Sequence, residues 1–157
     1  MSEIDEARLL AQEGTFAAAF AAGDLELARG LYREDVVYLS PTVRLFDWPA
    51  RIEGVDRTLE FIALTIRGCR DIAYAPQEWA CLADGRSSFV RVHFDWDPAS
   101  PRSAGRRAET SAEREPLARL RSSYVVLYRH RDGRIAQQEL YYDPSGPPEV
   151  LEERAIV

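Results

Sequence analysis

The sequence predicts an α+β fold in which three helices pack against one face of a curved antiparallel sheet. Apolar residues recur at helical spacing in the first half of the chain, and β-rich runs dominate the second half. Two Asp-Gly pairs, at 84–85 and 132–133, are typical hairpin turns. Helices gathered on one side of such a sheet form a cone, so we expect a pocket between the two layers.

Three segments have the periodicity of helices. The apolar residues of 5–23, 24–32 and 54–68 repeat at intervals of three or four. Gly23 and Gly68 are natural ends for the first and third segments. The spacing therefore predicts two helices at the start of the chain and one in its middle.

The segment between these helices predicts one short strand and a loop. Residues 35–39 have strand composition, and Pro41 ends the run because proline cannot donate to a sheet. Residues 42–53 predict a loop whose apolar tip is Trp48.

The second half predicts four antiparallel strands. Residues 71–82 and 86–97 form one hairpin, with Asp84-Gly85 as a tight turn. Residues 117–143 form a longer hairpin that turns at Asp132-Gly133. Residues 98–116, rich in Pro, Ser, Gly and Arg, predict a flexible loop that could hang over the pocket mouth. Only a short tail is expected after the second hairpin.

Length and charge limit the classes of function. A chain of 157 residues suits one domain and leaves no room for a second. All 20 basic residues are arginine, and 26 acidic residues give a net charge of −6, which disfavours a nucleic-acid partner. The acidic start and the lack of a long apolar run predict a cytoplasmic protein without a membrane anchor.

No motif indicates a metal or a cofactor. The sequence contains no HExxH, P-loop, GxGxxG or GxSxG pattern. Cys69 and Cys81 lie twelve residues apart without a paired histidine, so we expect small apolar residues rather than a disulfide or a metal site. The sequence therefore predicts no cofactor and no metal.

Motifs spread over almost the whole chain resemble the NTF2-like superfamily, in particular its SnoaL-like and ketosteroid-isomerase-like branch. The motifs are Phe20, Gly23–Glu26, Leu31–Tyr38, Ile52–Gly54, Asp132–Ile135 and Tyr141–Pro144. The resemblance implies a conical α+β domain with a hydrophobic pocket and, usually, a homodimer. Enzymes of this superfamily isomerise, cyclise, dehydrate or hydrolyse small and often polycyclic molecules, whereas other members only bind a ligand.

The chain departs from the family at the positions that carry acids and bases. By the resemblance, Phe16 takes the place of the isomerases' catalytic tyrosine, and Ser40 that of their general base. Their oxyanion-binding aspartic acid falls at Val125 or Val126, and the essential aspartate of the cyclases falls at Leu140. If this chain is an enzyme, its catalytic set is its own.

Two alternative acid–base groups can be proposed from the residues. His93 and Asp95, with Arg91, share one face of a strand at a spacing of about 7 Å, so the imidazole could act as a general base. The apolar alternation of the neighbouring residues favours the other interpretation, that this face points away from the core. Asp47, beside Trp48, could place a carboxyl with a raised pKa at the pocket mouth, or it is an ordinary loop aspartate.

Aromatic and amide side chains are the candidate ligand contacts. Tyrosine hydroxyls in an apolar pocket can polarise a carbonyl, or they are amphipathic core residues whose hydroxyls reach water. His130, between two arginines next to a turn, is expected on the surface. The predicted ligand-contacting residues are Phe16, Tyr38, Ser40, Trp48, Phe61, Tyr124, Tyr128, Gln138, Leu140 and Tyr142.

Two functions from different classes remain open. The first is an enzyme of the isomerase, cyclase or dehydratase type that acts without a cofactor on a small apolar or polycyclic molecule. The second is a ligand-binding or dimerisation module without catalysis, supported by the loss of the family's acids and bases. A peptide-binding role comes third, because Trp48 is its one candidate anchor.

Overall fold

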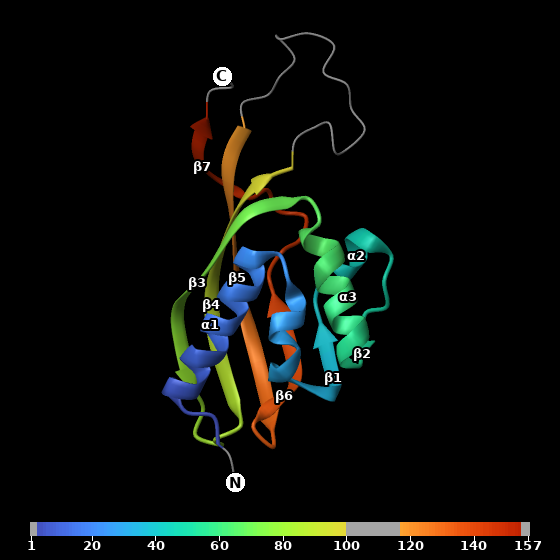
Figure 1. The fold of residues 1–157 in the computed structure, drawn as a ribbon, viewed down its shortest axis with the longest axis vertical. Helices are drawn as coiled ribbons and strands as arrows, with labels where there is room; N and C mark the ends of the chain where they lie inside the picture. The colour runs from blue at the N-terminus through green and yellow to red at the C-terminus, as the bar shows by residue number, and fades with distance from the viewer. Residues whose placement is uncertain (1–2, 100–116, 155–157) are drawn as a thin grey trace.

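The computed structural model describes residues 3–99 and 117–154 and consists of one sheet with helices packed against it (Figure 1). The helices are α1 (Glu6–Ala22), the 3-10 helix η1 (Leu25–Leu31), α2 (Val43–Phe46) and α3 (Val55–Ile66). The strands are β1 (Tyr32–Leu39), β2 (Ile52–Glu53), β3 (Cys69–Cys81), β4 (Ser87–Pro98), β5 (Leu117–Arg131), β6 (Arg134–Tyr141) and β7 (Glu149–Arg154).

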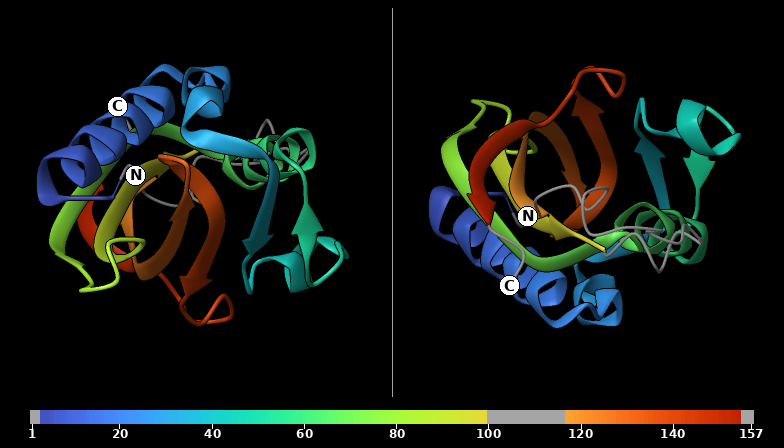
Figure 2. Two further views of the ribbon diagram at one scale, coloured as in Figure 1. Left: turned by 90° about the horizontal axis from the view of Figure 1, so that it is seen from below. Right: turned by 90° about the horizontal axis from the view of Figure 1, so that it is seen from above.

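The sheet is curved and mainly antiparallel. Its order is β2-β1-β6-β5-β4-β3, and β7 pairs with the first part of β5. The pairing of β1 with β6 is parallel, and every other pairing among the described strands is antiparallel. Figure 2 shows the strands curling around the side on which α1 and α3 lie. The α+β class predicted from the sequence is confirmed.

Helix α1 supplies most of the helical cover. The Asp5 side chain accepts a hydrogen bond from the N–H of Arg8 at 2.8 Å, which caps the first turn. Gly23 ends the helix in the left-handed region, at φ 65°. Its buried face contains apolar residues and two polar ones, Gln12 and Glu13. Buried polar groups need hydrogen-bond partners inside the protein, so Gln12 and Glu13 require polar groups in the part of the core next to this helix.

One of the two predicted tight turns is confirmed. Asp132 (φ 54°) and Gly133 (φ 75°) both have positive φ, as a type I′ turn requires. The other hairpin forms as predicted, from β3 and β4, but its turn is not a type I′ turn, since of the Asp84-Gly85 pair only Gly85 has a positive φ. The connection spans Leu82–Ser87, and the Asp84 carboxylate accepts two backbone hydrogen bonds within it at 2.8 Å each. An aspartate that bonds the following N–H groups stabilises a wider loop.

Several element boundaries differ from the sequence expectation. The second helical segment is a 3-10 helix, β1 begins at Tyr32, and the predicted loop 42–53 contains α2 and β2. The tail contains β7, which is held by pairing with β5 through contacts such as Leu120 with Val150. Such a long-range partner leaves no local signal in the sequence. Of the predicted flexible loop, Pro98 belongs to β4, and residues 100–116 lie outside the described part of the chain.

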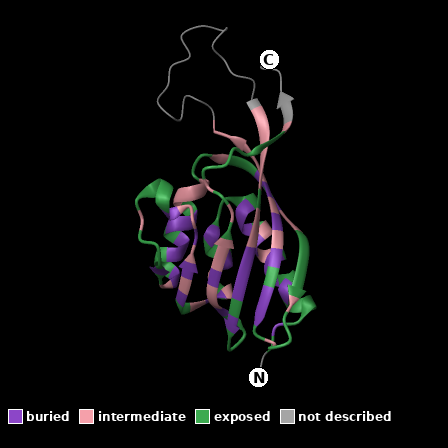
Figure 3. Ribbon diagram, turned by 180° about the vertical axis from the view of Figure 1, so that it is seen from behind, coloured by how far each residue is buried: buried purple, intermediate pink, exposed green. Residues whose placement is uncertain are grey.

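The core lies between the helices and the inner face of the sheet. Figure 3 shows that the buried residues gather in the body of the domain, below the region where β5 and β7 project. Rings from six elements and from both layers meet there at centroid distances of 5.2–6.2 Å. The buried aromatic residues are Phe16, Phe20, Tyr32, Tyr38, Phe61, Tyr74, Phe94 and Tyr128. The few polar atoms inside this aromatic core define the candidate site.

Candidate functional site

A carboxylic acid lies at the centre of the aromatic core. Glu13 on α1 is 1% exposed. The Tyr74 hydroxyl, from β3, donates to Glu13 Oε1 at 2.7 Å, and the Tyr128 hydroxyl, from β5, donates to Oε2 at 3.0 Å. No arginine of the described chain forms an ion pair with this carboxyl. Glu13 is therefore a buried acid that is held by neutral donors.

The surroundings of Glu13 bring its pKa close to neutrality. Burial raises the pKa from its ordinary value of 4.5 to about 7. Hydrogen bonding by Tyr74 and Tyr128 and the nearby amide of Gln12 oppose this rise, because they favour the charged form. Both protonation states of Glu13 are then populated at neutral pH, which suits a group that accepts and returns protons.

Other tyrosine hydroxyls surround this acid. Burial raises the pKa of Tyr32 and Tyr124 well above 10, so both hydroxyls stay neutral and act as donors. The charge of Glu13 contributes to both shifts, which places the hydroxyls within its electrostatic reach. Tyr32 donates to Gln138, whereas the Tyr124 hydroxyl has no hydrogen-bond partner among the described residues. Tyr124 is thus a half-buried donor with a free hydroxyl.

A second polar cluster lies where β1 ends. Ser40 is close enough to the hydroxyls of Tyr38 and Tyr142 to lower the pKa of both, although burial raises each of them more strongly. The Tyr142 ring lies 5.8 Å from that of Tyr124, centroid to centroid. This ring contact places Tyr124 next to the second cluster.

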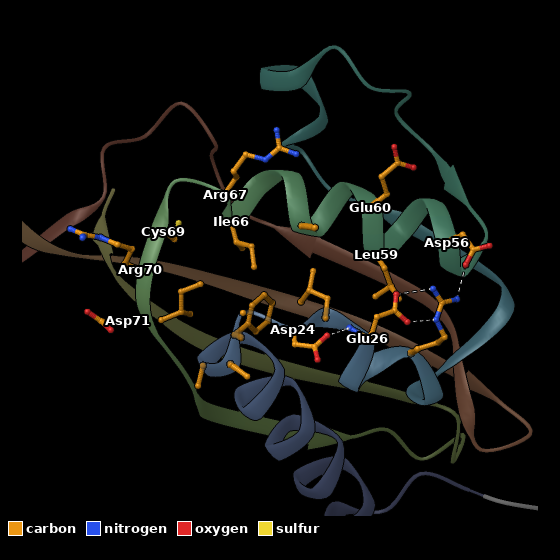
Figure 4. A pocket seen from close by; sticks show the side chains of 18 residues that line it. Asp24, Glu26, Asp56, Leu59, Glu60, Ile66, Arg67, Cys69, Arg70 and Asp71 are labelled. Atoms are coloured by element: carbon orange, nitrogen blue, oxygen red, sulfur yellow. Dashed lines mark hydrogen bonds and ion pairs between the residues drawn. The ribbon is translucent and has the colours of Figure 1, made fainter. Parts of the chain in front are cut away.

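An open groove lies beside the core, between the end of α1, η1, α3 and the start of β3 (Figure 4). Its volume is about 950 Å³. Apolar side chains such as Leu59 and Ile66 form its floor. Charged side chains stand around it, and Arg29 bridges Glu26 and Asp56 at its edge, at 2.7 and 2.6 Å. A groove of this size can hold a small polycyclic molecule.

Two stacked aromatic rings, Phe20 and Tyr74, lie between the groove and the buried acid. Phe20 lines the groove, and its ring stacks on that of Tyr74 at 5.3 Å. Tyr74 in turn donates to Glu13. Phe20 is 8% exposed, so it closes the inner end of the groove in this structure.

The three predicted catalytic residues lie away from this core. His93 and Asp95 alternate with the core residues of β4 and therefore face the other side of the sheet. The His93 Nε2 lies 3.2 Å from an Arg91 nitrogen, and Asp95 accepts two hydrogen bonds from Arg121 at 2.8 and 3.0 Å. Asp47 is exposed at the end of α2 in the left-handed region, at φ 55°. The structure does not bring these residues together with Glu13.

The ten predicted ligand-contacting residues are buried or half-buried. The buried ones are Phe16, Tyr38, Ser40, Phe61, Tyr128 and Gln138. The half-buried ones are Trp48, Tyr124, Leu140 and Tyr142. Trp48 packs on Phe61 at 5.1 Å and lies beneath the Arg57 guanidinium at 4.7 Å.

Two candidate residues, Glu13 and His130, were not predicted correctly from the sequence. Glu13 lies four residues after Leu9 and three before Phe16, on the buried stripe of α1. An acid on an apolar stripe is the signal that could have revealed it. His130 was expected on the surface, but it is 6% exposed and hydrogen-bonds to Gln12 on α1. It is buried because α1 crosses over the end of β5.

The described residues contain no group of three potential metal ligands. Cys69 and Cys81 are half-buried free thiols, and burial raises the pKa of Cys69 to about 11. None of the helices in residues 3–99 and 117–154 is long and apolar enough to cross a membrane.

Solved structures share this architecture. A proposed polyketide cyclase from Pseudomonas putida KT2440 is 19% identical, with a TM-score of 0.61, over 85% of this chain and 90% of that one. A proposed isomerase from Bacillus subtilis is 23% identical, with a TM-score of 0.61, over 90% and 91%. A protein with a ketosteroid-isomerase-like fold from Catenulispora acidiphila, in complex with trimethylamine, is 15% identical, with a TM-score of 0.60, over 85% and 86%. The fold is therefore that of the NTF2-like and ketosteroid-isomerase-like proteins.

The family model gives the narrower assignment. The model of the SnoaL-like domain matches residues 14–138, which is most of the chain. The chain belongs to the SnoaL-like domain family. A search of curated proteins found no match.

Proposed function

We propose that this protein is an acid–base enzyme that acts on a small, uncharged, apolar or polycyclic molecule, with Glu13 as the proton-transferring group. The observation that supports this proposal most strongly is the Glu13 carboxyl, 1% exposed and held by two tyrosine hydroxyls without a cation. A purely structural carboxylate in such a position would be paired with a positive charge. Membership of the SnoaL-like family and the likeness to a proposed cyclase and a proposed isomerase fit the same class of reaction.

The chemistry that these groups can perform is proton transfer next to a carbonyl. The Glu13 carboxylate takes a proton from the carbon beside the carbonyl, the electrons of the C–H bond form a C=C bond, and the π electrons of the carbonyl move to its oxygen. The enolate oxygen accepts a hydrogen bond from the free hydroxyl of Tyr124. Protonated Glu13 then returns the proton to the same molecule at a second carbon, or to a hydroxyl group whose C–O bond breaks so that it leaves as water. These steps need no cofactor, and the first outcome is an isomerisation and the second a dehydration.

The groove beside Phe20 is the proposed binding place for the substrate. Its floor is apolar, and its volume of about 950 Å³ is that of sites for small molecules. Turning the Phe20 ring away would open the groove toward Tyr74, whose hydroxyl donates to Glu13. The tyrosine hydroxyls of the core would then receive the oxygens of the substrate.

Deuterium exchange tests this proposal without knowledge of the natural substrate. A panel of cyclic and polycyclic ketones is incubated with the protein in D₂O, and the loss of signal from the protons beside the carbonyl is followed by NMR. We expect accelerated exchange of at least one ketone by the wild type, with a rate that rises through a pH near 7. We expect no acceleration by Glu13→Gln, and wild-type rates for the matched variant His93→Ala. Exchange that persists in Glu13→Gln would refute the proposed role of Glu13.

A ligand-binding module without catalysis is the second candidate. It is favoured by Phe16, by Ser40 and by Val125 or Val126, which stand at positions where, by resemblance, the isomerases carry reactive groups. Tight binding of a ketone by the wild type and by Glu13→Gln, with no exchange by either, would support this candidate.

We also propose a homodimer, formed through the outer face of the sheet. Phe89 on β4 and Tyr141 on β6 are 37% and 50% exposed there, and Val125 on β5 lies between their strands. Exposed apolar side chains on neighbouring strands are typical of an interface. A monomer in sedimentation equilibrium at micromolar concentration would argue against it.

A further inference from the structure

A buried amide on β6 has one end that is hydrogen-bonded and one end that is free. Gln138 is 7% exposed, and it is one of the residues that the sequence predicts to contact a ligand. The Tyr32 hydroxyl, from the start of β1, donates to Gln138 Oε1 at 2.5 Å. The Gln138 amide nitrogen has no hydrogen-bond acceptor among the described residues. Its N–H groups are therefore donors inside the core without a partner.

The hydrogen bond from Tyr32 fixes the direction of this amide. An amide oxygen can only accept, and the Tyr32 hydroxyl has one hydrogen to donate. The reverse direction of the amide would leave both the hydroxyl hydrogen and the amide oxygen unpaired, whereas the observed direction leaves only the N–H groups unpaired. Tyr32 is 2% exposed, and its ring lies 5.9 Å from that of Phe16, so its hydroxyl cannot turn to water instead. The Gln138 nitrogen is thus directed away from Tyr32.

Direct contacts place this amide beside the candidate site. Gln138 and Tyr128 are paired across β6 and β5, so their side chains share one face of the sheet with Cβ atoms about 5 Å apart. The Tyr128 hydroxyl donates to Glu13 Oε2 at 3.0 Å. The Phe16 ring lies 6.2 Å from that of Tyr128 and 5.9 Å from that of Tyr32. One side chain therefore separates the free amide from the proposed acid.

We propose that Gln138 binds a second oxygen of the substrate through its amide N–H, and that Tyr32 is the positioning residue that holds the amide in this direction. The first oxygen is the carbonyl oxygen that meets Tyr124 in the proposed reaction. Gln138 pairs with Tyr128, four residues after Tyr124 on β5, so the backbones of the two donors lie about 13 Å apart along the strand. The substrate is then a polycyclic ketone with an acceptor oxygen remote from its reacting carbonyl.

This choice of substrate rests on the function proposed above, whereas the direction of the Gln138 amide is a property of the free protein. A buried donor without an acceptor is unfavourable, and a ligand oxygen next to it removes that cost. A ligand with a methylene group at the same place leaves the N–H unpaired. We therefore expect about a tenfold difference in affinity between two ligands that differ only in this way.

The test compares 4′-methoxyflavone with its isostere 4′-ethylflavone, which has a methylene group in place of the ether oxygen. Neither compound has a saturated carbon beside its carbonyl, so calorimetry measures binding without reaction. We expect the wild type to bind the methoxy compound about tenfold more tightly. Gln138→Met should bind both compounds equally. The ratio of the two affinities reports the oxygen alone, because a change in packing affects both compounds.

Tyr32→Phe tests the positioning role. Without the hydroxyl the amide can turn, so the preference for the methoxy compound should fall at least about threefold, with the affinity for the ethyl compound within about twofold of the wild type. In the Gln138→Met background, Tyr32→Phe should leave the ratio unchanged. The matched control is Ser88→Ala, which removes a buried hydroxyl on the other side of Tyr128 and should keep the wild-type ratio.

Absence of a preference in the wild type would overturn the proposal, as would a preference that survives in Gln138→Met. An effect of Tyr32→Phe that persists in the Gln138→Met background would refute the positioning role. If Tyr32→Phe does not fold, the Gln138 side-chain N–H signals of the wild type decide: in NMR they should move on addition of the methoxy compound and not of the ethyl compound. A preference without deuterium exchange of any ketone would refute the proposed reaction alone, and exchange without a preference would refute the role of Gln138 alone.

Discussion

Replacement of Glu13 by glutamine should abolish a large part of the pH dependence of stability. The pKa of Glu13 is about 7 in the folded state, against an ordinary value of 4.5 that applies to the unfolded chain. Below pH 4.5 the group is protonated in both states. Between pH 4.5 and 7 it is protonated in the folded state and ionised in the unfolded state, so unfolding releases a proton and the free energy of unfolding falls as the pH rises. Above pH 7 both states are ionised, and the contribution is constant.

The structure gives the size of this effect. The two pKa values differ by about two and a half pH units, which at about 1.4 kcal/mol per unit amounts to about 3 kcal/mol. Urea unfolding of the wild type and of Glu13→Gln, at half-unit steps from pH 4.5 to 8, measures the difference between the two proteins. His130, with its lowered pKa, changes the stability in the opposite direction, but it contributes equally to both proteins and cancels.

We expect the free energy of unfolding of Glu13→Gln to rise by about 3 kcal/mol relative to that of the wild type as the pH increases from 4.5 to 8. Most of this gain should lie between pH 5 and 7. A difference that stays constant within about 0.5 kcal/mol would refute the inference that Glu13 is buried as a neutral acid.

Two further predictions concern the neighbours of Glu13. Tyr74→Phe removes a donor to the carboxylate, so the titration midpoint of Glu13 should rise by about one pH unit; an NMR titration that shows no rise would contradict the 2.7 Å hydrogen bond. Phe20→Ala should cost about 3–5 kcal/mol of stability and should increase the binding of an apolar fluorescent probe, because the groove then opens toward the core. Leu27→Ala, at a position 53% exposed, is the control and should change the stability by less than about 0.5 kcal/mol, and equal probe binding by both variants would argue against Phe20 as the inner wall.

Local patterns in the sequence were sufficient for most of the fold. The periodic residues of α1 and α3, and the turn at Asp132-Gly133, carry their own signals. The strand β7 was missed because its stability comes from pairing with β5, a contact that no short window contains. The alternation of apolar and polar residues along β4 favoured an outward direction for His93. The structure has this direction, since the residues that alternate with His93 are buried.

The centre of the candidate site could not be predicted in the same way. Glu13 receives its hydrogen bonds from Tyr74 and Tyr128, which are 61 and 115 residues away in the chain. A single acid on the apolar face of a helix can be recognised as part of a site only when the strands that supply its hydrogen-bond donors are placed beside it. His130 was predicted to lie on the surface because arginines flank it in the sequence. In the structure α1 covers its ring and leaves the flanking arginines exposed.

The central claim is that a carboxyl inside this domain is ready to exchange protons at neutral pH. The most direct test is the titration of the Glu13 carboxyl carbon in the wild-type protein by ¹³C NMR from pH 4 to 9. We predict a midpoint close to 7. A midpoint near the ordinary value of 4.5 would contradict the claim and remove the basis for the proposed reaction.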